Sequence, residues 1–181
     1  AIFESLLQRN KASIRVTDLS RKEEIKALLD ASDSALSASG LVKEQGHFAG
    51  HDLFAEGAIT IQDESSQLVA PTLDLQGEEQ VLDACAAPGG KTAHMASYLT
   101  TGQVTALDLY DHKLTLIQEN AQRLGVADRV QTQKLDARKV HEFFGKDQFD
   151  KILVDAPCSG IGLLRRKPDI KYNKDTADFA S

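Results

Sequence analysis

A short run of small residues is the first feature of this sequence that could do chemistry. Residues 83–92 read Asp-Ala-Cys-Ala-Ala-Pro-Gly-Gly-Lys-Thr. Small residues let a ligand approach the backbone closely, and a helix that begins there offers free N–H groups. Gly90, Lys91 and Thr92 match the end of a phosphate-binding P-loop, but that motif needs a glycine five positions before Gly90, where this chain has Cys85. The run therefore predicts a nucleotide-type cofactor without a triphosphate, and the alternative is a tight turn without a ligand.

Three aspartates follow predicted strands at the points where the strands end. They are Asp108, Asp136 and Asp155, and the first comes about 20 residues after the glycine run. In an open parallel sheet, ligands bind beyond the carboxyl ends of the strands, and a carboxylate placed like Asp108 can accept both hydroxyls of a ribose. Each aspartate alone is more often a helix cap or turn residue. Three of them at neighbouring strand ends favour a ligand site.

The two cysteines differ in their surroundings. Cys158 follows a predicted strand in the loop Asp-Ala-Pro-Cys-Ser-Gly at residues 155–160, near a basic segment. A thiol in such a place could be made reactive by a lowered pKa, and the alternative is a buried small side chain. The residues alone therefore favour Cys158 as a nucleophile, whereas Cys85 is expected to be buried.

A basic segment follows that loop. Residues 164–174 carry five positive charges and one negative charge, Asp169, in a chain whose net charge is −6. A solvated face is the usual explanation of such a run, but its place beside the predicted cleft favours contact with a polyanion, with Tyr172 available for stacking. The residues expected to contact RNA are Arg165, Arg166, Lys167 and Lys171.

The histidines do not predict a metal site. His47 and His51 are four residues apart, but they lie in a glycine-containing segment without acidic or thiol partners, which is typical of a loop. We therefore expect no metal.

Alternating strands and helices position these residues. The pattern predicts a doubly wound α/β core with a parallel sheet of about four strands. Its expected strands are residues 81–85, 104–107, 130–135 and 149–154, and its expected helices include residues 91–99 and 111–124. Gly125 is expected to end the second of these helices.

The first part of the chain is less regular and predicts a small α+β lobe. We place this lobe at residues 1–75 and the core at residues 76–181. The expected elements of the lobe are strands at residues 14–19 and 58–61 and helices at residues 21–29 and 65–75, with a loop at residues 32–40.

Composition narrows the class of protein. The chain has 181 residues, 41% of them hydrophobic, and no apolar run approaches the length of roughly 20 residues that a transmembrane helix needs. The N-terminal residues do not resemble a secretory signal, and two cysteines suit a reducing compartment. We therefore expect a cytoplasmic protein that does not bind membranes, and a monomer.

Several of these segments together resemble the Sun/Fmu family of S-adenosylmethionine-dependent RNA cytosine-5 methyltransferases, especially its members that act on ribosomal RNA. The resemblance covers residues 10–175. The segments that carry it are residues 62–70, 83–92, 120–125 (Asn-Ala-Gln-Arg-Leu-Gly), 155–160 and 165–171.

The resemblance implies a Rossmann-like class I methyltransferase core that binds S-adenosylmethionine. In that family pattern Asp108 would hold the ribose, Asp136 would lie near the adenine edge, and Asp155 would face the methyl group and the target base. Lys113 stands where relatives often carry arginine, so it keeps the charge but lacks the planar fork. The methionine part would be wrapped by Cys85, Ala86, Ala87, Pro88, Gly89, Gly90 and Lys91.

Methylation of carbon 5 of cytosine requires a thiolate that adds at carbon 6, and the base must be unstacked to be reached. The family pattern places the attacking cysteine in a later Thr-Cys-Ser motif and gives the Pro-Cys thiol, here Cys158, a role in product release. These 181 residues contain no Thr-Cys pair.

We therefore expect the cofactor-binding core of a small-subunit ribosomal RNA cytosine-5 methyltransferase, truncated at its C-terminus, that binds cofactor but turns over poorly by itself. Two alternatives remain. One is a non-catalytic module that binds S-adenosylmethionine or RNA, and the other is an enzyme that uses Cys158 as its nucleophile.

Overall fold

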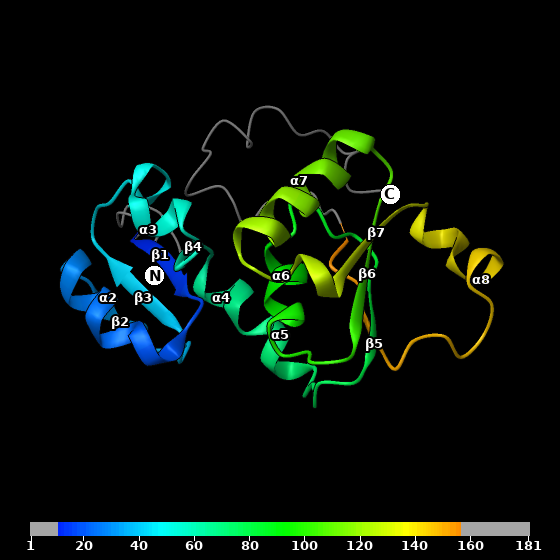
Figure 1. Ribbon diagram of the computed structural model, residues 1–181, viewed down its shortest axis with the longest axis horizontal. Coiled ribbons are helices and arrows are strands. Elements are labelled where there is room, and N and C mark those ends of the chain that lie inside the picture. Colours follow the sequence, from blue (N-terminus) through cyan, green and yellow to red (C-terminus); the bar gives the residue numbers. More distant parts are fainter. Residues whose placement is uncertain (1–10, 157–181) are drawn as a thin grey trace, which may run out of the picture.

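The computed structural model describes residues 11–156, which contain an antiparallel sheet followed along the chain by a parallel sheet (Figure 1). Each sheet has four strands within this part of the chain. The antiparallel sheet forms an N-terminal lobe, and the parallel sheet forms the core that carries the glycine run.

The lobe has the strand order β2-β3-β1-β4. Its strands are β1 (Ala12–Val16), β2 (Ser32–Asp33), β3 (Gly40–Lys43) and β4 (Ile59–Ile61). Its helices are α2 (Lys22–Leu29) and α3 (Asp52–Ala55), with short 3-10 turns at Leu19–Arg21 and Phe48–Gly50.

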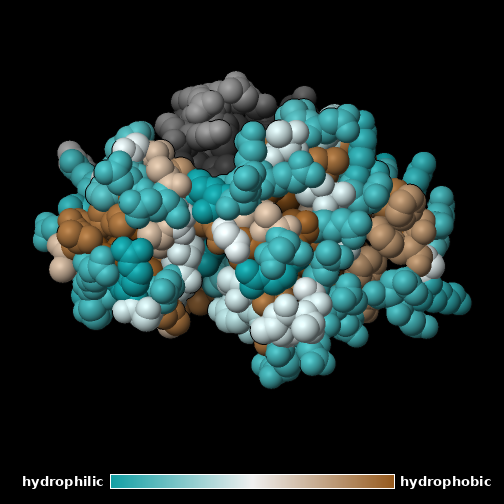
Figure 2. Space-filling model, viewed as in Figure 1, coloured by the Kyte–Doolittle hydropathy of each residue, from teal (hydrophilic) through white to brown (hydrophobic). Residues whose placement is uncertain are grey.

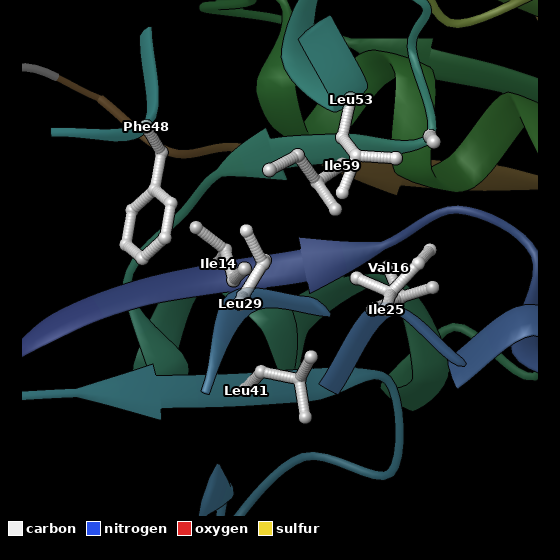
Figure 3. Packing of buried hydrophobic residues seen from close by; sticks show 9 residues of the cluster. Ile14, Val16, Ile25, Leu29, Leu41, Phe48, Leu53 and Ile59 are labelled. Atoms are coloured by element: carbon white, nitrogen blue, oxygen red, sulfur yellow. The ribbon is translucent and has the colours of Figure 1, made fainter. Parts of the chain in front are cut away.

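Periodicity decides which face of the lobe sheet becomes its apolar core. Ile14 and Val16 alternate along β1 and point to one face, while Arg15 between them points to the other. Ile25 and Leu29 lie four residues apart on α2 and pack against that apolar face (Figure 3). The opposite face, which carries Arg15, is polar and meets the core.

The core sheet has the strand order β7-β6-β5-β8, with every pair parallel. Its strands are β5 (Gln80–Asp83), β6 (Gln103–Asp108), β7 (Val130–Lys134) and β8 (Lys151–Leu153). Its helices are α5 (Val69–Thr72), α6 (Gly90–Ala96), α7 (Asp111–Arg123) and α8 (Val140–Phe143), with 3-10 turns at Ala127–Arg129 and Ala137–Lys139. Helix α4 (Glu64–Gln67) connects the two parts and contacts both β1 of the lobe and α6 of the core.

Helices α5, α6 and α7 cover one face of this sheet, where Val81 and Val104 are fully buried. Gly125 follows α7 with a φ of +70°, and its N–H donates to the carbonyl of Gln122 while that of Val126 donates to Ala121. This pair of bonds ends the helix where the sequence predicts.

The sequence prediction of the fold class, a Rossmann-like methyltransferase core with a parallel sheet, is confirmed. Three details were wrong. The loop expected at residues 32–40 contains β2 at Ser32–Asp33, whose small and polar residues form a strand only because they pair with Leu41 and Val42 of β3. The helix expected at residues 65–75 is broken into α4 and α5, because Pro71 has no N–H to donate to the carbonyl of Gln67. The strand β3 was not predicted, because its apolar stretch is only Leu41-Val42. Within residues 11–156, no helix has the length and apolarity needed to cross a bilayer.

Candidate functional site

The backbone of the turn after β5 is tied to both neighbouring strands. The N–H of Ala84 donates to the carbonyl of Leu153 in β8 at 2.9 Å, and the N–H of Ala86 donates to the carbonyl of Leu107 in β6 at 2.9 Å. The glycine run therefore lies across the carboxyl edge of the sheet, where the chain order of the strands reverses beside β5. Ligands of open α/β sheets bind at such an edge.

The two glycines of the turn have different tasks. Gly89 has a φ of +98°, and a Cβ at this position would lie 3.0 Å from the Cα of Ile117. The turn therefore needs glycine at position 89 for its backbone conformation and its packing. A Cβ at Gly90 would meet no atom within 4 Å. Open space beside Gly90, which borders a cavity, forms a cradle that a ligand can fill.

A cavity of about 210 Å³ lies beside this turn, and we call it the glycine-turn cavity. Its polar centre is an ion pair, in which Lys91 Nζ lies 2.7 Å from Asp155 Oδ2. The lobe supplies one wall and the core supplies the other. The lining residues are Ile61, Gln62, Asp63 and Ser66 from the first part of the chain, and Asp83, Cys85, Ala86, Ala87, Pro88, Gly90, Lys91 and Asp155 from the core.

Asp83 is the buried carboxylate of this cavity, with 1% of its surface exposed. Thr92 Oγ1 donates to its Oδ2 at 2.7 Å. Burial raises the pKa of Asp83 to about 6, because the charged form loses hydration that one hydroxyl does not replace. This carboxyl group therefore sits close to its titration point near neutral pH.

A larger cavity of about 720 Å³ lies on the other face of the sheet, at the ends of β5, β6, β7 and β8, and we call it the strand-end cavity. Most of its wall is apolar, and exposed hydrophobic side chains gather over the neighbouring α8 (Figure 2). The lining residues are Leu82, Ala84, Cys85, Asp108, Leu109, Tyr110, Lys113, Leu135, Asp136, Ala137, Arg138, Val140, Ile152, Val154 and Ala156.

Two of the predicted acids border the strand-end cavity. The side chain of Asp108 is 10% exposed, and its Oδ2 lies 3.9 Å from Lys113 Nζ. Asp136 accepts from the N–H of Arg138 and pairs with the guanidinium of that residue at 2.6 Å. This hydrogen-bonded pair lowers the pKa of Asp136 to about 2. Both acids follow their strands, as the parallel register requires.

Cys85 was expected to be buried, but its place in the turn after β5 leaves it half-buried, and it lies where the two cavities meet, since it lines both. Burial raises the pKa of its thiol, and the nearby carboxylates Asp83, Asp108 and Asp155 raise it further. Groups that disfavour a thiolate favour a cation at the same place. The junction of the cavities is therefore suited to a positively charged ligand group.

The structure brings most of the sequence-predicted site residues to these two cavities. Gly89 shapes the turn and does not line either cavity. Sequence reasoning missed the apolar wall formed by Leu109 and Tyr110, although two large apolar residues directly after a strand-end acid are a usable signal. The predicted residues Cys158, Arg165, Arg166, Lys167 and Lys171 lie outside the described residues.

Sequence reasoning also missed the contribution of Gln62 and Ser66, because nothing in their spacing relates them to the glycine run. Among residues 11–156 no group of histidine, cysteine and acidic side chains is arranged to hold a metal ion.

The two cavities together fit S-adenosylmethionine in chemical terms. The strand-end cavity combines the carboxylate of Asp108 with an apolar wall, a lining that suits a nucleoside. The junction at Cys85 favours a sulfonium, and the open cradle at Gly90 leaves room for the amino-acid part.

A parallel sheet with a glycine turn after its first strand and carboxylates beyond its strand ends defines the Rossmann-like core of an S-adenosylmethionine-dependent methyltransferase. The sequence profile of the 16S rRNA methyltransferase RsmB/F family matches residues 70–181. The chain belongs to that family. The family and cofactor expected from the sequence are thus confirmed.

Known proteins of this kind match most of the chain. The probable ribosomal RNA small subunit methyltransferase B of Bacillus subtilis (strain 168) is 52% identical over 153 residues, which are 84% of this chain and 34% of that protein. The chain spans about a third of the length of the curated relatives it matches.

Solved structures share the fold. A methyltransferase homolog protein from Pyrococcus horikoshii is 30% identical, with a TM-score of 0.75 over 93% of this chain and 58% of that one. NSun6 from the same organism, solved with SFG, has a TM-score of 0.84 over 97% of this chain and 70% of that one. It is 19% identical, so it supports the fold alone.

Proposed function

We propose that this chain binds S-adenosylmethionine and serves the methylation of carbon 5 of a cytosine in small-subunit ribosomal RNA. The observation that carries the proposal is that Cys85 lines both cavities, with Asp83 and Asp155 in the wall of the polar one and Asp108 in the wall of the apolar one. The substrate class is supported by the RsmB/F family and by relatives named ribosomal RNA small subunit methyltransferase B. A ribosomal RNA substrate also supports a cytoplasmic protein.

The residues of the strand-end cavity would hold the nucleoside. In this proposal Asp108 accepts both ribose hydroxyls, and Lys113 Nζ faces that carboxylate from 3.9 Å. The adenine ring would lie against Leu109 and Tyr110, with Asp136 at its edge. Burial of apolar surface would supply most of the affinity, while the carboxylates would set the orientation.

The residues of the glycine-turn cavity would hold the target base. Bound S-adenosylmethionine supplies an electrophilic methyl group. The 2.7 Å ion pair with Lys91 fixes the carboxylate of Asp155, which can accept a hydrogen bond from the exocyclic amine of a cytosine. Gln62 and Ser66 form the opposite wall, so an unstacked base would lie between the lobe and the core.

The reaction needs a thiolate that bonds to carbon 6, which moves an electron pair to carbon 5 for attack on the methyl group. Loss of the carbon 5 proton then breaks the carbon–sulfur bond. Cys85 is poorly suited to this attack, because burial and three carboxylates raise the pKa of its thiol. Cys158 is the other cysteine of the chain. An experiment that traps the covalent adduct between thiol and RNA must therefore test the two cysteines separately.

Calorimetric titration with S-adenosylmethionine tests the cofactor half of the proposal. A folded chain that does not bind the cofactor would contradict it. Incubation with labelled cofactor and small-subunit ribosomal RNA tests transfer, and the labelled product should be 5-methylcytidine. Binding without transfer is the result expected if these 181 residues hold the cofactor but lack the attacking thiol of the Thr-Cys-Ser motif.

A 5-fluorocytosine-substituted RNA tests the thiol, since the fluorine blocks loss of the group at carbon 5 and leaves the covalent adduct. An adduct lost in Cys158→Ala and kept in Cys85→Ala would identify Cys158 as the nucleophile. An adduct lost only in Cys85→Ala would refute our reading of Cys85.

A further inference from the structure

The end of α7 contacts the N-terminal lobe through bare backbone. Gly57 precedes β4 with a φ of +76°, and a Cβ at this position would overlap the carbonyl oxygen of Arg123. Such an approach is open to glycine alone. The last turn of α7 is therefore a fixed point of contact between the lobe and the core.

The side chain of Arg123 extends from that turn into the lobe. Its Nη1 donates to the carbonyls of Phe54 at 2.8 Å and Ile59 at 3.3 Å, and its Nη2 donates to Thr60 Oγ1 at 3.3 Å. The guanidinium also stacks on the Phe54 ring, with its carbon 3.9 Å from the ring centroid. Among the described residues, Arg123 has these neutral partners and no carboxylate within ion-pair distance. Its guanidinium therefore links the core to the lobe by hydrogen bonds and does not form an ion pair.

The same side chain continues toward the glycine turn through Asn120. Arg123 Nη2 donates to Asn120 Oδ1 at 3.1 Å, and Asn120 Nδ2 donates to the carbonyl of Pro88 at 2.7 Å. Asn120 thus uses its acceptor toward the lobe and its donor toward the turn. Three side-chain hydrogen bonds in series connect Thr60 of β4 to Pro88 of the glycine-turn cavity.

We propose that Arg123 and Asn120 are positioning residues that couple the placement of the lobe to the conformation of the cofactor-binding turn. Ile61 and Gln62 directly follow Thr60 and form the lobe wall of the glycine-turn cavity, while Pro88 belongs to the core wall. The hydrogen-bonded series therefore sets the relation between the two walls. The amino-acid part of the cofactor, which would lie beside Gly90, selects the clamped conformation of the turn, so cofactor binding and lobe placement reinforce each other. The nature of that ligand rests on the proposed function.

Two variants separate the halves of the series. Asn120→Asp keeps an acceptor for Arg123 but removes the donor to Pro88. Arg123→Lys keeps the charge but removes the fork and the stacking on Phe54. The matched control is Arg129→Lys, because Arg129 donates to the carbonyls of Ala96 and Leu99 and so makes its contacts inside the core.

Hydrogen exchange of the ligand-free chain gives the first readout. The N–H of Gly89 donates to the carbonyl of Ala86 at 2.7 Å and reports on the closed turn. We expect its exchange to become about fivefold faster in Asn120→Asp and Arg123→Lys and to stay at the wild-type rate in Arg129→Lys. Calorimetry should show an S-adenosylmethionine Kd raised about three- to tenfold in the same two variants, and unchanged in the control.

Folded variants whose Gly89 exchange and cofactor Kd both match the wild type would overturn the inference, and so would an equal response in Arg129→Lys. If Arg123→Lys does not fold, Asn120→Asp decides alone. If the wild-type chain does not bind S-adenosylmethionine, the proposed function fails, whereas the exchange rate of Gly89 still decides the coupling.

Discussion

The glycine-turn cavity and the strand-end cavity share Cys85 but are built in opposite ways. The glycine-turn cavity is small, lies between the lobe and the core, and contains the Lys91–Asp155 ion pair and the buried carboxyl of Asp83. The strand-end cavity is more than three times larger, belongs to the core alone and is mainly apolar. Interactions made only in a transition state raise a rate, whereas uniform binding raises affinity. The contrast assigns affinity to the strand-end cavity and reactivity to the glycine-turn cavity.

The strongest way to break this contrast is to distort the turn between the two cavities. Gly89→Ala places a Cβ 3.0 Å from the Cα of Ile117 at a φ of +98°, so we expect a loss of about 4 kcal/mol of folding free energy. Urea denaturation measures the loss. Gly90→Ala is the matched control, because its Cβ would meet no atom within 4 Å and should leave stability within about 1 kcal/mol of wild type. Equal destabilisation by both changes would contradict the specific need for glycine at position 89.

The assignment of affinity is tested next at Asp108. Asp108→Ala removes the proposed acceptor of two ribose hydroxyls, which should cost about 3 kcal/mol, or about 100-fold in the Kd for S-adenosylmethionine. Calorimetry measures the change. Asp111→Ala serves as the control, since Asp111 lies outside both cavities in an exposed pair with Lys134 and should leave the Kd unchanged. An unchanged Kd in Asp108→Ala would show that the ribose does not bind at Asp108.

The pH dependence of the free energy of unfolding tests whether the glycine-turn cavity contains a buried carboxyl group with a raised pKa. The folded state raises the pKa of Asp83 from 3.8 to about 6, so it holds this proton more tightly than the unfolded chain does. The carboxyl group therefore costs stability above about pH 6 and costs nothing below about pH 4. Asp83→Asn keeps an acceptor for Thr92 and should stabilise the chain by about 2 kcal/mol at neutral pH.

This gain should fade as the pH falls from about 6 to about 4. Urea denaturation of both proteins across that range measures the difference. His94, whose pKa burial lowers to about 3, titrates in the opposite sense in both proteins and cancels. A gain that does not depend on pH would show that folding leaves the pKa of Asp83 at its unfolded value.

The smallest expected effect concerns the apolar wall. Leu109 is 49% exposed, so Leu109→Ala should change stability little. It removes apolar contact with the proposed adenine site and should weaken S-adenosylmethionine binding by about 1 kcal/mol. Leu116→Ala provides the control, because Leu116 is 44% exposed on α7 and lines neither cavity. Equal Kd values for the two variants would show that Leu109 is not part of the cofactor-binding site.

The sequence pattern of strands and helices predicted those site residues whose position follows directly from a parallel sheet. Asp108 ends β6, whose apolar residues are visible in the sequence, and Asp136 follows β7, which is marked only by the alternation from Val130 to Leu135; their placement at one edge requires only a parallel register. Gln62 and Arg123 could not be predicted in the same way. Their positions depend on how the lobe packs against α7, which is decided by a glycine contact and by side-chain hydrogen bonds between distant segments.

The backbone bonds that tie Ala84 and Ala86 to the neighbouring strands have a consequence for evolution and design. The shape of the turn is carried by amide and carbonyl groups that every residue except proline possesses. The half-buried side chain at Cys85 can therefore be exchanged with little change of the cradle, whereas Ala84 and Ala86 are buried and must stay small. A library at position 85 would alter which sulfonium donors are accepted while the backbone of the turn is kept.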